Sequence, residues 1–234
     1  MAERHIIALG GGGFSVGESL AVDRYLLQQA RREHPRVAFV GTASGDAETY
    51  LERFMAAFAP LDCEPTHLPL FRRTPELRSF VLEQDVIYVG GGNTRSMLAV
   101  WREWGLPELL REAWEAGTVL AGISAGAICW FEQGVTDSGA DALGAIECLG
   151  LLPGSCCPHY AGEPERRPGY RALLEDGRIG PGLAIDDAAA VHFAGDALRQ
   201  VVCSQAGARA YRLELVDGAV SETELPAKLL EEPA

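Results

Sequence analysis

Short apolar segments alternate with amphipathic segments from residue 5 to residue 122, and this alternation restricts the fold more than any other feature of the chain. The expected strands are residues 5–10, 36–41, 66–70, 86–89 and 118–122, and the expected helices are residues 18–33, 47–59, 75–82, 95–104 and 107–116. Strands that alternate with helices are joined by crossover connections, which place them in parallel. We therefore predict an α/β fold, a doubly wound and mainly parallel sheet with helices on both faces.

The pattern changes after about residue 130. A stretch rich in Gly and Pro, with Pro153, Pro158, Pro164 and Pro168, is interpreted as active-site loops. From Leu183 the chain is rich in expected strands, at residues 191–194, 200–204 and 210–216, and an Asp217-Gly218 turn predicts an antiparallel hairpin near the C-terminus. We expect one domain over residues 1–227 and a frayed tail over residues 228–234.

Charge and composition exclude several classes of function. The chain has 33 acidic and 20 basic residues, a formal net charge of −13, which disfavours nucleic acid and anionic membrane surfaces as partners. No apolar run approaches about eighteen residues and no signal peptide pattern is present, so we expect a cytoplasmic protein. The six cysteines form no CxxC pair, which indicates reduced thiols. A zinc site of Cys156, Cys157 and His159 is disfavoured, because adjacent cysteines rarely reach one metal.

The segment Gly122-Ile123-Ser124-Ala125-Gly126 follows an expected strand and precedes a segment, residues 127–131, that can form a helix. This is the G-x-S-x-G pattern of a nucleophile elbow in the context that it requires. The serine of such an elbow occupies a strained turn, and glycines flank it because side chains there would clash. A Gly-rich turn without chemistry is the alternative, and the strand before it favours Ser124 as a nucleophile.

A serine nucleophile needs a base and an acid. Lys228 is the only lysine, so a Ser-Lys dyad is disfavoured, and of the five histidines His159 is favoured because it lies in a loop after the elbow. The acid is left open between the pair Asp186 and Asp187, which follow an apolar segment, and the upstream Asp137.

Acyl transfer also needs two hydrogen-bond donors for the oxyanion. The elbow supplies the N–H of Ala125, and the loop at residues 90–93, which includes Gly91, Gly92 and Asn93, is expected to supply the second. The glycines at residues 10–13 are an alternative, and neither glycine run fits a dinucleotide-binding pattern.

The elbow, the glycine loop and the His159 segment together resemble the peptidase E family of serine peptidases, whose type member is an aspartyl dipeptidase. The similar stretches are residues 8–15, 40–45, 88–94, 121–130 and 152–160. The resemblance implies a fold related to class I glutamine amidotransferase domains, a Ser-His-acid triad, and no metal or cofactor. It places Ser124 and His159 in that triad with Asp187 as the acid, although the family has glutamate there. Asp186 and Asp137 remain alternatives.

The resemblance also implies how the substrate is recognised. Aspartyl dipeptidases use an arginine after the histidine to bind the acidic side chain, and Arg167 matches it best in a stretch that also holds Arg166 and Arg171. We thus expect Asn93 and Arg167 to bind a small peptide substrate, namely a dipeptide with N-terminal Asp. The sequence is also compatible with a homodimer. The alternatives are a cyanophycinase-like hydrolase of aspartyl-arginine linkages and a non-catalytic amidotransferase-like binding module. Because the elbow residue is serine, a glutaminase is disfavoured, although Cys129 lies nearby.

Overall fold

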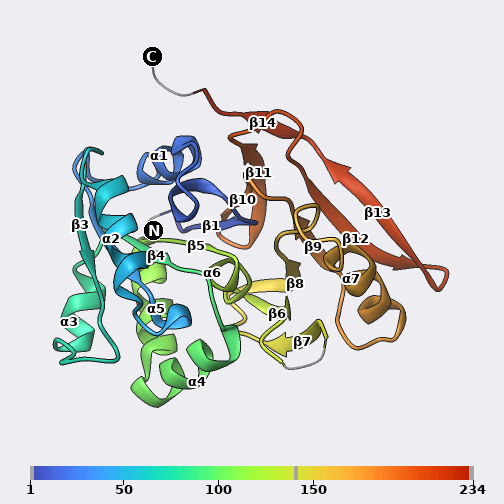
Figure 1. The fold of residues 1–234 in the computed structure, drawn as a ribbon, viewed down its shortest axis with the longest axis horizontal. Coiled ribbons are helices and arrows are strands. Elements are labelled where there is room, and N and C mark those ends of the chain that lie inside the picture. The colour runs from blue at the N-terminus through green and yellow to red at the C-terminus, as the bar shows by residue number, and fades with distance from the viewer. Residues whose placement is uncertain (1–2, 140–141, 232–234) are drawn as a thin grey trace.

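The computed structural model describes residues 3–139 and 142–231, and these form two β-sheets with helices packed around them (Figure 1). The strands of the larger sheet are β1 (His5–Leu9), β2 (Arg36–Val40), β3 (Glu64–His67), β4 (Val86–Val89), β5 (Val119–Ile123), β10 (Ala189–Ala194), β11 (Ala197–Cys203) and β14 (Ala227–Leu229). They lie in the order β14-β11-β10-β1-β5-β4-β2-β3. The first five in sequence pair in parallel, and β10 and β11 add antiparallel neighbours, so the prediction of a mainly parallel sheet is confirmed.

Helices cover both faces of this sheet because successive side chains of each strand point to opposite sides. On one face, Ile7 and Leu9 of β1 share a core with α1 (Ala21–Leu27) and α2 (Glu48–Phe58). On the other face, Ile6 and Ala8 share a core with α4 (Thr94–Trp104), α5 (Leu106–Ala116) and α6 (Ala125–Ile128). The remaining elements on this part of the chain are α3 (Leu77–Leu82) and the 3-10 turns η1 (Gly13–Ser15) and η2 (Thr42–Ser44).

The smaller sheet combines strands within residues 131–157, which were predicted to be loops, with strands at residues 182–185 and 210–225, where the chain was predicted to be rich in strands. Its strands are β6 (Phe131–Thr136), β7 (Gly144–Glu147), β8 (Leu152–Cys157), β9 (Gly182–Ile185), β12 (Ala210–Val216) and β13 (Ala219–Leu225), in the order β13-β12-β9-β8-β6-β7. The helix α7 (Arg166–Glu175) packs on β12 and β13, the hairpin drawn from orange to red in Figure 1. The loop prediction is therefore wrong for residues 131–157 and for α7, whereas residues 158–165 around His159 do form a loop. The predicted antiparallel hairpin is confirmed by β12 and β13. Pro153 is tolerated inside β8 because it lies at a bulge, where the register with β6 shifts.

Several element boundaries also differ from the predictions. The helix expected over residues 18–33 is confined to α1, because the polar residues that follow it offer little apolar surface for packing. The strand expected over residues 66–70 lies earlier, as β3, and the helix expected over residues 127–131 is the single turn α6. The tail does not fray from Lys228, since Lys228 pairs with Val202 in β14; residues 232–234 lie outside the described residues. No helix in residues 3–139 or 142–231 is long and apolar enough to cross a bilayer.

Candidate active site

Ser124 occupies a strained turn between β5 and α6. Its backbone has φ 57° and ψ −113°, a region that non-glycine residues rarely enter. A Cβ on Gly122 would overlap the carbonyl oxygen of Gly126, and a Cβ on Gly126 would overlap that of Val89. Both flanking glycines are thus required by close backbone contacts, as the nucleophile-elbow interpretation expects.

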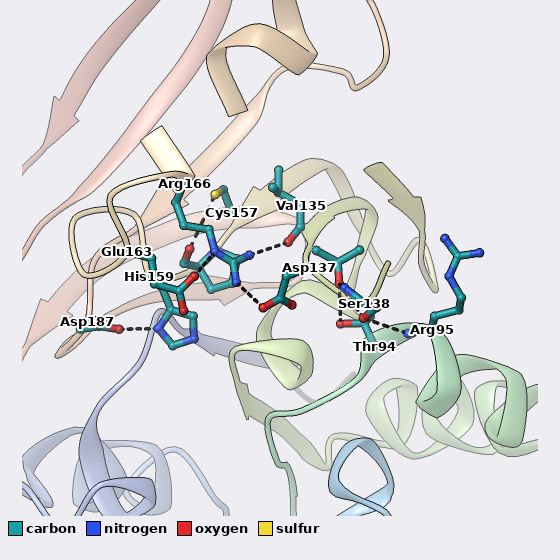
Figure 2. A network of polar contacts seen from close by, with 12 residues as sticks. Thr94, Arg95, Val135, Asp137, Ser138, Cys157, His159, Glu163, Arg166 and Asp187 are labelled. Carbon is teal, nitrogen blue, oxygen red and sulfur yellow. Dashed lines mark hydrogen bonds and ion pairs between the residues drawn. The ribbon is translucent and has the colours of Figure 1, made fainter. Parts of the chain in front are cut away.

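His159 and Asp187 lie in direct contact, as Figure 2 shows. The Nδ1 atom of His159 is 2.6 Å from Oδ1 of Asp187, and their side chains are 21% and 44% exposed. His159 follows β8 with φ 53°, and Asp187 follows β9. Because β8 and β9 are parallel neighbours, the loops at their carboxyl ends bring the two residues together. This contact leaves Nε2 of His159 as the ring nitrogen for another partner.

Two glycines enclose the His159–Asp187 pair. A Cβ on Gly11 would lie 2.7 Å from Nδ1 of His159 and would overlap the carboxylate of Asp187. A Cβ on Gly162 would overlap the other carboxylate oxygen of Asp187. The backbone therefore closes tightly around the pair, and a larger residue at either position would displace it.

The end of β1 anchors both Ser124 and His159. The N–H of Ser124 donates to the carbonyl oxygen of Leu9 at 3.1 Å, and the N–H of His159 donates to that of Gly10 at 3.2 Å. Leu9 and Gly10 are consecutive, so the two residues are fixed to neighbouring peptide groups of one strand. The serine, the histidine and its carboxylate thus gather at the carboxyl end of the parallel strands, where α/β folds place their sites.

The two alternative acids have other partners. Asp186 is buried and accepts a hydrogen bond from the N–H of Arg209 at 3.0 Å, and burial raises the pKa of its carboxyl above the ordinary value. Asp137 forms an ion pair with Arg166 at 3.3 Å. Of the three acids considered from the sequence, Asp187 is the one hydrogen-bonded to His159.

The other histidines with polar partners lie elsewhere. His5 and His192 are buried and 2.9 Å apart, and burial lowers the pKa of His192 to about 4. His34 pairs with Asp62 on the surface. The zinc site disfavoured above has no geometric basis either, since the side chains of Cys156 and Cys157 point into different cores.

The amides near Ser124 differ in their availability. A Cβ on Gly91 would lie 3.2 Å from Cβ of Ser124, so the predicted glycine loop does lie beside the serine. The N–H of Gly91, however, donates to the hydroxyl of Tyr50 at 3.2 Å. Within residues 3–139 and 142–231, the amides of Gly92 and Ala125 have no acceptor. Gly92 and Ala125 thus carry free donors, and Gly91 does not.

The glycine run at residues 10–13 and Asn93 have structural roles. Gly10 pairs with Ala189, and Gly11 packs against His159 and Asp187 as described. Asn93 caps α4, since its Oδ1 accepts from the N–H of Ser96 at 2.8 Å, and its own N–H donates to Ala43. The side-chain amide nitrogen of Asn93 is the part that remains for a ligand.

The arginines expected to meet a substrate lie on α7 rather than in a loop. Arg167 pairs with Glu222, lies over the rings of Tyr160 and Tyr211, and has a 56% exposed side chain. Arg171 contacts Glu222 at 3.4 Å.

Arg166 is only 3% exposed and is held by Glu163 at 2.5 Å, in addition to Asp137. Glu163 in turn donates its N–H to the carbonyl oxygen of His159, so the Arg166 network of Figure 2 adjoins the histidine. Each arginine of the cluster is therefore already paired with a carboxylate.

Tyr50 and Gly162 were not singled out from the sequence, and Gly11 was considered only as part of the glycine run at residues 10–13. Tyr50 lies one helical turn before Phe54, on the apolar face of α2, and its hydroxyl on that face was the available signal. Gly162 shortly follows His159, and Gly11 belongs to a glycine run, but their packing against Asp187 depends on tertiary contacts.

Comparison with known proteins identifies the family of this chain. The family model described as "Peptidase family S51" matches residues 6–201. The uncharacterized peptidase YgaJ of Bacillus subtilis is 54% identical over 229 residues, which cover 97% of this chain and 99% of that protein. Peptidase E of Streptomyces coelicolor is 30% identical over 193 residues, 76% of this chain and 74% of that protein.

A solved structure, a peptidase from an acI-B1 Actinobacterium, has the same fold, with a TM-score of 0.72 at 20% identity over 96% of this chain and 95% of that one. The family match spans β1 to β11 and so includes Ser124, His159 and Asp187. This chain is therefore a member of peptidase family S51.

Proposed function

We propose that this peptidase is a serine-type enzyme that hydrolyses short peptides, with a preference for dipeptides that begin with Asp. Ser124 is the nucleophile, His159 the general base and Asp187 the acid that orients it. The observation that carries the proposal is the His159–Asp187 hydrogen bond, together with the anchoring of Ser124 on the carbonyl of Leu9 and of His159 on that of Gly10. A base held by a carboxylate and set next to a serine on a strained turn is the arrangement that activates a hydroxyl.

In the first step the Oγ–H proton of Ser124 passes to Nε2 of His159 as Oγ forms a bond to the scissile carbonyl carbon. The carbonyl oxygen becomes an oxyanion, and the free N–H groups of Gly92 and Ala125 are the donors available to it. Asp187 accepts from Nδ1–H and stabilises the imidazolium. The carbon–nitrogen bond then breaks as His159 returns the proton to the leaving amine.

Water completes the reaction by the reverse sequence of proton transfers. His159 takes a proton from the water as its oxygen attacks the acyl carbon, and it returns that proton to Oγ when the acyl–Ser124 bond breaks. Every proton in this cycle moves through one histidine nitrogen. No step requires a group beyond the side chains and amides described.

The preference for N-terminal Asp rests on Arg167, which is exposed and carries a guanidinium fork suited to a carboxylate. Glu222 is the present partner of that guanidinium, so a substrate carboxylate must share or replace it. The Glu222 side chain is only 10% exposed and also contacts Tyr160 and Arg171, so a substrate carboxylate would share the exposed part of the Arg167 guanidinium with it.

A specific observation favours one alternative, hydrolysis of aspartyl-arginine linkages. The arginines of α7 are neutralised by Asp137, Glu163 and Glu222. A pocket of about 620 Å³ beside α7 is lined by Asp137, Glu165 and Asp176, with Arg178 as its counter-charge. An excess of carboxylates suits a guanidinium in the substrate better than an acid.

Covalent labelling tests the proposal. A fluorophosphonate should label the wild-type protein at Ser124, as peptide mass spectrometry would show, and Ser124→Ala should not react. A dipeptide panel with Asp, Glu, Ala or Arg at either position, and an aspartyl-arginine isopeptide, then separates the substrates. Absence of both labelling and hydrolysis would leave the non-catalytic binding module as the explanation, whereas cleavage of arginine-containing substrates alone would replace the aspartyl preference.

A further inference from the structure

A tyrosine that has no role in the proposed chemistry is hydrogen-bonded to the loop that follows β4. Tyr50 of α2 accepts the N–H of Gly91 at 3.2 Å, while the opposite side of Gly91 approaches Ser124. Gly91 thus lies between the hydroxyl of Tyr50 and the nucleophile. The N–H of Gly92, which follows it, is the one left without an acceptor in the described part of the chain.

The ring of Tyr50 is itself fixed. It stacks on Phe14 with centroids 5.6 Å apart and meets Phe39 edge-on at 5.1 Å. A Cβ on Gly90 would lie 3.0 Å from Cε1 of Tyr50 and 2.8 Å from Phe39, so Gly90 must lack a side chain for the loop to reach the ring. A hydroxyl on a ring with so little freedom is a well-defined acceptor.

We propose that Tyr50 is a positioning residue for the oxyanion site: by accepting the N–H of Gly91 it fixes the Gly90–Gly91 peptide, and so the place from which the next peptide presents the N–H of Gly92 as the donor that acts with Ala125. This inference rests on the proposed serine chemistry, which is what requires an oxyanion site. Of the two glycines expected from the sequence to donate, Gly91 is thus left out, because its N–H bonds to a residue 41 positions away on α2.

The physical reason is the directionality of oxyanion donors. A donor stabilises the transition state only if it points at the position that the oxyanion occupies, and loss of one donor costs about 10²–10³-fold in kcat. Without the hydroxyl, the N–H of Gly91 has no partner in the protein, and the Gly90–Gly91 peptide that precedes the donor is free to rotate. Rotation weakens the donor without removing it, so a smaller loss of about tenfold is expected.

The test compares Tyr50→Phe with Tyr25→Phe. The first deletes the acceptor for Gly91 and keeps the ring on Phe14 and Phe39. The second deletes another partly buried hydroxyl, which bonds to His192 at 2.5 Å within the same core and has no contact with the loop. In Tyr50→Phe, kcat should fall about tenfold with KM nearly unchanged, and the affinity for a peptide aldehyde, which forms a tetrahedral adduct with the serine, should weaken by the same factor. Tyr25→Phe should keep both values.

Amide hydrogen exchange gives a readout that does not depend on catalysis. Exchange at Gly91 should accelerate at least about tenfold in Tyr50→Phe, whereas exchange at Asn93, whose N–H is bonded to Ala43, should not change. Unchanged exchange at Gly91 would overturn the inference. So would faster exchange with an unaltered kcat, a loss confined to KM, or an equal kcat loss in Tyr25→Phe. If the wild-type protein hydrolyses no peptide, the proposed function fails. Tyr50 then has no role in catalysis, even if its hydrogen bond to Gly91 is present.

Discussion

Asp23 provides a test of how burial governs the stability of this fold. The carboxyl of Asp23 lies on α1, fully buried, where Oδ2 accepts from the N–H of Phe14 at 3.3 Å and Oδ1 has no partner among the described residues. Burial raises its pKa from 3.8 to about 7. The interior therefore favours the neutral acid over the carboxylate.

The sign of the pH dependence follows from this. At low pH the group is protonated in both folded and unfolded chains and has no effect. As the pH rises through 3.8, the unfolded chain releases the proton while the folded chain retains it up to about 7, so folding stability falls over that window and levels off above it. At ~1.4 kcal/mol for each pH unit, the window corresponds to about 4 kcal/mol.

Asp23→Asn removes the charge and keeps the shape of the side chain, and the amide oxygen of the asparagine can still accept from the N–H of Phe14. The free energy of unfolding should be measured by urea denaturation of both proteins at several pH values between about 5 and 8.5. The variant should gain stability over the wild type as the pH rises, by a few kcal/mol in total. Asp217→Asn, in the exposed turn of the β12–β13 hairpin, is the control and should show no such trend. A difference between Asp23→Asn and wild type that stays constant with pH would refute the reasoning.

Three further outcomes are expected. Asp187→Asn should lower kcat/KM about a thousandfold, while Asp186→Asn, whose oxygen can still accept from Arg209, should keep most activity; comparable losses in steady-state kinetics would contradict the acid assignment. Gly162→Ala should reduce kcat/KM at least tenfold by displacing Asp187, whereas Gly144→Ala, with open space around it, should not. Because burial lowers the pKa of His192 from 6.5 to about 4, the wild type should lose about 3 kcal/mol of stability relative to His192→Gln as the pH drops across that range. Parallel urea midpoints for the wild type and His192→Gln over this range would argue against that origin.

The parallel sheet could be predicted because its strands are marked locally. The strand expected over residues 86–89 coincides with β4, since an apolar run there lies between the charged Asp85 and a glycine turn. The smaller sheet could not be predicted in the same way. Strand β8 contains Pro153 and Gly154, which by themselves indicate a loop, and only pairing with β6 across a bulge makes them part of a strand.

The candidate site likewise contains residues that could be predicted from the local sequence and residues whose roles depend on tertiary contacts. Ser124 could be predicted because the elbow is a contiguous pattern whose glycines have local steric reasons. The choice of Asp187 over Asp186 needed the resemblance, and the geometry supports it because neighbouring residues at the end of β9 point their side chains in different directions. Arg167 shows the limit, since its partner Glu222 is distant in the sequence and comes close only when β13 packs on α7.

The anchoring of Ser124 and His159 on β1 has a consequence for how such a site can evolve. The separation of Ser124 and His159 is set by hydrogen bonds between backbone carbonyl and amide groups. Every amino acid supplies a carbonyl group, and every one except proline supplies an N–H. Substitution of side chains along β1 can therefore proceed without moving the two residues apart, as long as the strand keeps its length. An insertion or deletion at the end of β1 would instead shift both at once, so the length of this strand should vary less than its composition.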